Sequence, residues 1–391
     1  MRAQAFLNPL RAFTPPEAIS QRLPDKPIRF TNVVRDFIQS APPLDQQQTV
    51  EVLIRTCLDP AFTLLEFGSL LPEPDQARLA DPTAKGHNLH QLFERMAYSE
   101  PLFETFLSRI ADSPKDVKEI FTGKPFMFLV PNVGAASRFI ALANRAKAIG
   151  ITTTPAIFVS ACPDYSQKNK NKSPQEDALV SKAIATQLYD ELGVQPHLYV
   201  SCYNGGNPGF DGPLSVNHDN TLAFATSIPY ASLRLGDTFG KSTPETHGSA
   251  LTALHAESIE METVACHFHY DEAHSTDDNL VRTTGLVAES VIQGVLDFDG
   301  NSFSGGAKNP LTSSTAQQPK GPSGNLQYSQ LLGIAAALNL TVQNLTSEGD
   351  AVGSMVRIML AQQELFPQTP DLGVSLKVSH IQSACDQLID R

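Results

Sequence analysis

The distribution of apolar and polar positions changes near residue 124. From there, three short apolar runs are typical of buried strands, and amphipathic stretches separate them. The runs are "KPFMFLV" (124–130), "PAIFVSA" (155–161) and "QPHLYVSCY" (195–203). The stretches 136–150 and 173–193 are predicted helices, the second capped by Ser173 and ending near Gly193. This strand–helix alternation predicts a mainly parallel sheet covered by helices.

The pattern continues toward the end of the chain. We expect a strand in 221–235, a helix over "METVACHFHYDEAH" (261–274), and a strand with an acidic end in 289–300. A Gly/Ser/Pro-rich stretch (301–325) precedes a strongly apolar helix over 326–345. The glycine-rich loop 204–220 follows a predicted strand. Because ligands of open α/β sheets bind at the carboxyl ends of strands, this loop is well placed for a site.

The first 122 residues have a different pattern. Apolar residues recur at three- and four-residue spacing in "TVEVLIRTCLD", "NLHQLFERMAYSEPLFETFLSRIA" and "DVKEIF". We therefore expect two parts: a helical accessory region over residues 1–122, and an α/β domain with C-terminal helices over residues 123–391.

The composition narrows the class of protein. The chain has 391 residues, a formal net charge of -12 and 41% hydrophobic residues, which suits a soluble globular protein. The acidic balance argues against nucleic-acid binding, which needs a basic surface. The five cysteines are scattered without a Cys-x-x-Cys pair, so we expect reduced thiols in a cytoplasmic protein. No apolar run approaches the length of a membrane span, and a homo-oligomer is expected.

A cluster of metal-ligand residue types lies in "CHFHYDEAH" (266–274). On the predicted helix, His267 and His269 point to different faces, whereas His267 and Asp271 are one turn apart. A partial metal site is one interpretation. A hydrated helix end is the interpretation that we favour, so we predict no metal ion and no cofactor.

Three short acidic segments follow one another in order: "GDTF" (236–239), "IEMET" (259–263) and "VIQGVLDFDGN" (291–301). With the apolar helix that follows, this order resembles the nucleoside phosphorylase/nucleosidase superfamily. The closing helix and the extra N-terminal region look most like AMP nucleosidases. The resemblance covers roughly residues 124–345 and implies a three-layer αβα fold.

The resemblance also implies roles for particular residues. Phe239 would stack on the base, Met261 would pack against the ribose, and Glu262 would accept hydrogen bonds from the ribose hydroxyls. Asp297 would protonate the leaving purine, as acid catalysis at a glycosidic bond requires. Asp237 in the first segment and Gly205 in the glycine-rich loop would complete the substrate-binding set. The implied activity is cleavage of the N-glycosidic bond of a purine nucleoside or nucleotide.

The sequence departs from that family at important positions. The family's Arg in the last segment is Gln293 here, and its Ser or Cys before the acid is Leu296. A water-activating Glu is missing from "PFMFLVPNVGAAS", and a phosphate-binding Arg from "HLYVSCYNGG". Hydrolysis is therefore expected rather than phosphorolysis. The alternatives are a phosphorylase, an inactive nucleoside-binding scaffold protein, and an unrelated metal-dependent α/β enzyme using residues 267–274.

Overall fold

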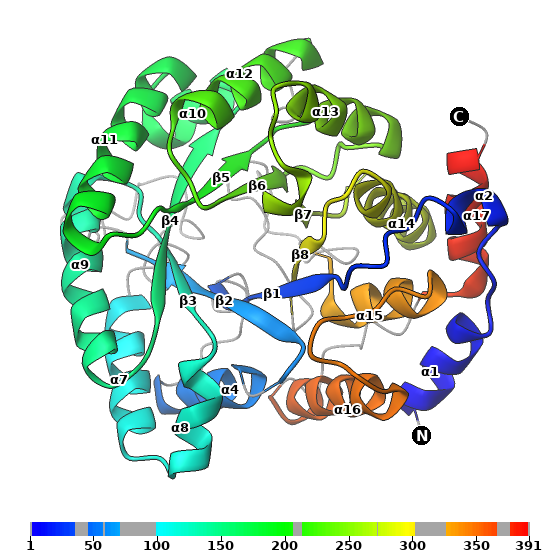
Figure 1. Cartoon of the computed structure of the whole chain (residues 1–391), viewed down its shortest axis with the longest axis horizontal. Helices are drawn as coiled ribbons and strands as arrows, with labels where there is room; N and C mark the ends of the chain where they lie inside the picture. Colours follow the sequence, from blue (N-terminus) through cyan, green and yellow to red (C-terminus); the bar gives the residue numbers. More distant parts are fainter. Residues whose placement is uncertain are drawn as a thin grey trace, which may run out of the picture.

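Eight parallel strands close into a barrel within the described part of the chain, and each strand pairs with the next in sequence order. In this computed structural model the described residues are 2–35, 46–57, 59–70, 99–205, 213–271, 273–301, 326–365 and 376–389. β1 pairs with both β2 and β8, which closes the ring. Helices surround the strands on the outside, so the architecture is that of a TIM barrel (Figure 1).

The strands are short, and the longest connection between two of them is the one from β2 to β3. Their bounds are β1 Arg29–Val33, β2 Phe62–Ser69, β3 Phe126–Leu129, β4 Thr153–Ser160, β5 His197–Ser201, β6 Ser232–Asp237, β7 Val264–Phe268 and β8 Asp297–Gly300.

Helices lie before, between and after these strands. Two precede the barrel: α1 Arg2–Arg11 and α2 Glu17–Ser20. Those between strands are α4 Gln46–Cys57, α7 Ser99–Ala111, α8 Lys115–Thr122, α9 Val133–Ala148, α10 Pro163–Lys170, α11 Pro174–Leu192, α12 Leu214–Ser227, α13 Pro244–Ala256, the short 3₁₀ helix η1 Met261–Thr263, and α14 Thr276–Ile292. After β8 come α15 Tyr328–Ala337, α16 Glu348–Leu365 and α17 Val378–Ile389.

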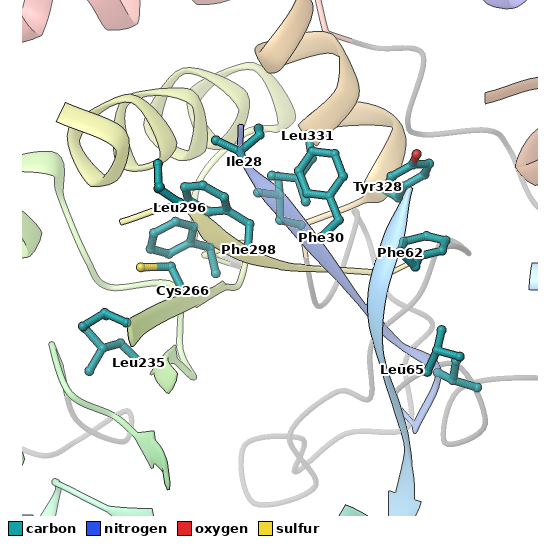
Figure 2. Packing of buried hydrophobic residues seen from close by; sticks show 14 of the residues in the cluster. Ile28, Phe30, Phe62, Leu65, Leu235, Cys266, Leu296, Phe298, Tyr328 and Leu331 are labelled. Carbon is teal, nitrogen blue, oxygen red and sulfur yellow. The ribbon is translucent and has the colours of Figure 1, made fainter. Parts of the chain in front are cut away.

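Residues that point outward from the strands form the main core beneath the helices. Phe30 of β1 lies edge-on to Tyr328 of α15, with ring centroids 5.5 Å apart, and Phe62 of β2 contacts the same tyrosine ring. Leu331 and Phe298 complete this region, as Figure 2 shows. The packing joins the first two strands of the barrel to the last one through α15.

The barrel interior has an apolar side and a polar side. Leu64, Met127, Leu129 and Ala156, from β2, β3 and β4, form a small apolar cluster of their own. Opposite them, Arg234 of β6 reaches acceptors on β1 and β8, which are not its neighbours in the sheet. A side chain can make such contacts only across the interior, so this side of the barrel is a buried polar network.

The predicted three-layer αβα fold is wrong. The strand–helix alternation from residue 124 was recognised, but β1 and β2 lie within the first 122 residues, which the sequence pattern assigned to helices. β1 pairs with β8, so the sheet curls into a closed ring instead of remaining open. The first 122 residues thus supply two strands of the barrel wall.

Several local predictions are confirmed and others are wrong. The apolar runs at 124–130, 155–161 and 195–203 contain β3, β4 and β5. Ser173 caps α11 through a capping box with Glu176, and Gly193 ends that helix in the left-handed conformation. By contrast, the strand expected in 221–235 is the end of α12 followed by β6, and the helix expected in 261–274 contains β7.

Two further observations bear on the composition-based predictions. All five cysteines are buried and free, as expected from their scatter. Among the helices described here, none is both long and apolar enough to span a bilayer.

Candidate metal and active site

Two histidines meet at the carboxyl end of the barrel. His267 lies in β7, and His269 follows one residue after the strand ends. Successive side chains of an extended chain alternate between faces, so residues two apart point the same way. The two imidazoles accordingly face each other, with their Nε2 atoms 2.8 Å apart. Active sites of this fold lie at this end of the strands.

Asp299 of β8 orients the first of these rings. Its carboxylate lies 3.3 Å from Nδ1 of His267 and accepts a charge-assisted hydrogen bond from Arg234. Burial alone would raise the pKa of Asp299, but Arg234 and His267 outweigh burial and hold the pKa below its usual value. An ionised Asp299 at this distance favours the tautomer of His267 that carries its proton on Nδ1, which leaves the lone pair on Nε2.

The second ring is held neutral. Burial, followed by the nearby His267, Arg35 and Arg282, lowers the pKa of His269 well below its ordinary value. In the absence of a metal ion, His269 therefore donates its Nε2 proton to Nε2 of His267. With its proton on Nδ1 instead, His269 would present its Nε2 lone pair as well, and both histidines could then hold a cation.

An arginine and a glutamate lie on the same side of the barrel. Arg35 follows β1, and its Nε donates to Glu66 Oε1 of β2 at 2.5 Å. The Glu66 side chain is fully buried, whereas Arg35 keeps 14% of its side chain exposed. Because Arg35 is ionised at all relevant pH values and partly exposed, it offers a guanidinium to an anionic ligand.

The predicted acid and ribose clamp lie at the opposite end of the strands. Asp297 is the first residue of β8, where it accepts a hydrogen bond from Thr31 and lies 3.5 Å from Arg234. Glu262 is exposed in η1, before β7, and pairs with Lys26. Met261 beside it is buried in the core. In this fold, that end of the barrel usually serves stability.

The other three predicted residues lie at the carboxyl ends of β5 and β6. Phe239 packs edge-on against Tyr165, with ring centroids 5.7 Å apart. Asp237 is buried and pairs with Arg282 at 3.1 Å. Gly205 has φ +139°, and a Cβ there would lie 2.7 Å from Cβ of Lys241, so glycine is required by both conformation and space. These residues are near the candidate site in the fold, but none contacts the histidine pair in the described interactions.

Sequence reasoning missed the residues that carry the site. Arg35, Glu66 and Asp299 were not singled out, and the histidine pair was dismissed because a helix places them on different faces. The available signal was the His-x-His spacing directly after the apolar "VAC". In a strand, that spacing puts both rings on one face.

The donor set fits a divalent cation in part. The two Nε2 atoms, 2.8 Å apart, are close enough for both to bind one ion with bonds to nitrogen of about 2.0–2.1 Å. Within the described ranges, no group of three or more His, Cys, Asp and Glu residues could hold a metal ion. Further ligands would have to be amide or carbonyl oxygens, water, substrate or residues outside those ranges.

No model of a known protein family matches this sequence, and no curated protein matches it. Solved structures do resemble it. The HMG-CoA lyase of Bacillus subtilis has 18% identity and a TM-score of 0.62, covering 92% of this chain and 98% of that one. An HMG-CoA lyase of Acinetobacter baumannii, in complex with coenzyme A and 3-methylmalate, has 15% identity and a TM-score of 0.60, covering 90% and 96%.

A third similar structure is the carboxyl transferase domain of Rhizobium etli pyruvate carboxylase. It has 14% identity and a TM-score of 0.50, covering 96% of this chain and 52% of that one. At these identities the likeness establishes the barrel fold alone. It nevertheless overturns the resemblance to nucleoside phosphorylases, and with it the predictions of purine nucleoside cleavage and of a purine nucleoside or nucleotide as ligand.

Proposed function

We propose that this barrel is a metal-dependent lyase of the aldolase type, which breaks or forms a carbon–carbon bond beside a carbonyl group. The observation that carries the proposal is the histidine pair, His267 and His269, whose Nε2 atoms are 2.8 Å apart at the carboxyl end of β7. The similar structures support the reaction class, since HMG-CoA lyases and a pyruvate carboxyl transferase both act on acyl or oxo acids.

His267 and His269 would hold a divalent ion, and Asp299 would keep His267 in the tautomer that binds it. When bound, such an ion supplies Lewis-acid polarisation of carbonyl and hydroxyl oxygens. Asp36, the next residue after Arg35 in the sequence, lies outside the described residues. It is an acidic residue adjacent in sequence to the candidate site, so mutagenesis should include it.

The protein's own residues would bind and orient the substrate. Arg35 is partly exposed and lies near His269, where its positive charge would attract a carboxylate or an oxygen that gains negative charge as the bond breaks. Glu66 accepts from Arg35 Nε and fixes the plane of the guanidinium. The substrate class that fits is a small hydroxy- or oxo-carboxylic acid, free or as a thioester.

The test begins with metal binding. Purified protein, stripped with a chelator and reloaded with Mg²⁺, Mn²⁺, Co²⁺ or Zn²⁺, should bind about one ion per chain by elemental analysis. The variants His267→Ala and His269→Ala should lose that ion. His255→Ala, which removes an exposed histidine in the last turn of α13, should keep it.

The reaction is tested on a panel of hydroxy acids and their coenzyme A thioesters, with HMG-CoA and 3-methylmalate included. Cleavage products are followed by chromatography, and exchange of protons beside the carbonyl is followed by NMR in D₂O. Metal-dependent cleavage or exchange that disappears in Arg35→Ala would support the proposal. An ion that binds equally well without both histidines would refute it.

A further inference from the structure

The backbone of His269 is held by a side chain from the next helix. His269 lies one residue beyond β7, in a single-residue bridge and not in the strand itself. Its carbonyl oxygen accepts a hydrogen bond of 2.5 Å from Nη2 of Arg282, in the second turn of α14. The orientation of the imidazole depends on this backbone because the ring is carried directly by it.

The same guanidinium binds two other segments at the carboxyl end of the barrel. Nη1 of Arg282 donates to the Asp237 carboxylate at 3.1 Å and to the Ser242 carbonyl at 2.9 Å. Asp237 ends β6, and Ser242 precedes α13. Arg282 thus connects the ends of β6 and β7 to α14 through one rigid, planar group.

The surroundings of Arg282 keep it in place. Its side chain is 12% exposed and that of Asp237 is 2% exposed, so the ion pair is largely removed from water. Asn279, one turn earlier in α14, exchanges two hydrogen bonds of 2.8 Å with the backbone of Asp271. The β7–α14 connection is therefore attached to α14 at His269 and again at Asp271.

We propose that Arg282 is a positioning residue for His269: it fixes the carbonyl of this residue so that Nε2 faces Nε2 of His267. The proposal rests on the proposed metal site. Groups that orient metal ligands commonly contribute a factor of about 10–100 in metal affinity. The competing explanation is that Arg282 only stabilises the fold through Asp237.

The experiment measures Co²⁺ affinity of the metal-free protein from visible absorption, with urea unfolding measured in parallel. Arg282→Gln should bind Co²⁺ about 10–100-fold more weakly than wild type. The matched control is Arg357→Gln. Arg357 of α16 pairs with buried Asp59 at the same 3.1 Å, in contacts separate from the histidine pair. The Arg357→Gln protein should be less stable than wild type but bind Co²⁺ with unchanged affinity.

Arg282→Lys keeps a positive charge beside Asp237 and so protects folding if the glutamine variant does not fold. A single ammonium group cannot reproduce the fork that reaches both the Ser242 and His269 carbonyls. We expect near wild-type stability with Co²⁺ affinity lowered about tenfold. Wild-type affinity in a folded Arg282→Lys or Arg282→Gln protein would overturn the proposal, as would an equal loss in Arg357→Gln.

The experiment gives a different result if the proposed metal site itself does not exist. If wild-type protein does not bind Co²⁺, or binds it equally well in His267→Ala and His269→Ala, both the proposed function and the role of Arg282 are refuted. If binding needs both histidines but is unaffected by the Arg282 substitutions, the metal site stands and the positioning role alone is refuted.

Discussion

Arg234 lies inside the barrel with no exposed surface, and its charge is balanced by carboxylates of β8 and β2. The Asp299 carboxylate accepts a hydrogen bond from Nη1 of Arg234, and the Asp297 carboxylate lies 3.5 Å from Nη2. The Thr31 hydroxyl accepts a hydrogen bond of 3.0 Å from Nη2. Burial lowers the pKa of Arg234, but these two aspartates and Glu66 outweigh it, so the guanidinium remains charged. The ion pair both stabilises the interior and fixes the carboxylate that faces His267.

Asp299→Asn should therefore destabilise the protein strongly. It removes one partner of a buried pair and leaves the charge of Arg234 poorly compensated, a change that typically costs about 3–5 kcal/mol. Asp297→Asn is the control. Burial raises the pKa of Asp297, only partly offset by Arg234, so a neutral amide should cost less there. Urea unfolding measures the free energy of unfolding of both variants. An equal loss of stability in the two variants would contradict the idea that Asp299 is the main partner of Arg234.

A second buried histidine predicts the response to acid. Nδ1 of His247 accepts from Tyr203 and Nε2 donates to Ser290, whose hydroxyl in turn donates to the carbonyl of Leu286. Burial lowers the pKa of His247 to about 3. The folded protein keeps this imidazole neutral, while the unfolded chain takes up a proton below about pH 6.5.

Stability should consequently fall as the pH drops from about 6.5 toward 3, and His247 should contribute about 1.4 kcal/mol per pH unit. His247→Gln keeps a donor and an acceptor but cannot titrate. The difference in unfolding free energy between wild type and this variant should therefore shrink on acidification. Urea unfolding at several pH values tests this, and a difference independent of pH would contradict it.

At the scale of elements, the sequence pattern predicted strands correctly where an apolar run was unbroken. It did not predict strands whose polar side chains point into the barrel. β3 reads "FMFL" and was found. β7 reads "VACHF", and its inward positions continue into His269, so its pattern resembled an amphipathic helix. β1, "RFTNV", was missed because Thr31 points into a polar interior and interrupts the apolar run. Polar residues that point inward thus obscured the strands that carry them.

The contact between α13 and α14 depends on a small residue. A Cβ at Gly285 of α14 would lie 2.8 Å from Cγ of Pro244, a ring atom that cannot move aside. Gly285→Ala should therefore destabilise the protein by about 1–3 kcal/mol despite the better helix propensity of alanine. Gly353→Ala in α16 meets only the end of the Arg357 side chain at 3.4 Å and should stabilise by up to about 1 kcal/mol. Thermal unfolding compares them, and stabilisation by both changes would refute the packing argument.

At the scale of the whole molecule, the sequence pattern alone could not show that the first two strands belong to the same barrel as the other six. Ring closure depends on pairing between β1 and β8, and no local periodicity reports which distant strands become neighbours. The core in Figure 2 likewise combines Phe30 and Phe62 with Phe298 and Tyr328. Local sequence patterns could therefore not predict the fold class, although they did predict three of its strands, β3, β4 and β5.

A fragment that begins at residue 123 tests whether the rest of the barrel can fold without its first two strands. It lacks β1 and β2, so β3 and β8 would have free edges and the outward face of β8 would lose Phe30. We expect no cooperative thermal transition and poorly dispersed NMR spectra, while the full chain shows both cooperativity and dispersion. A fragment that unfolds cooperatively would support an independent domain over residues 123–391.

The pairing of β1 with β8 also affects how fast the chain folds. Every other strand pair joins neighbours in sequence, which are connected by a single crossover containing one or more helices, so these pairs need less chain to be closed. The last pair brings together segments separated by nearly the whole barrel sequence, and this closure raises the contact order and slows the rate-limiting step. Until it forms, the unpaired edges of β1 and β8 remain available to other copies of the chain. Refolding yield should accordingly fall with protein concentration, even when the native barrel is stable.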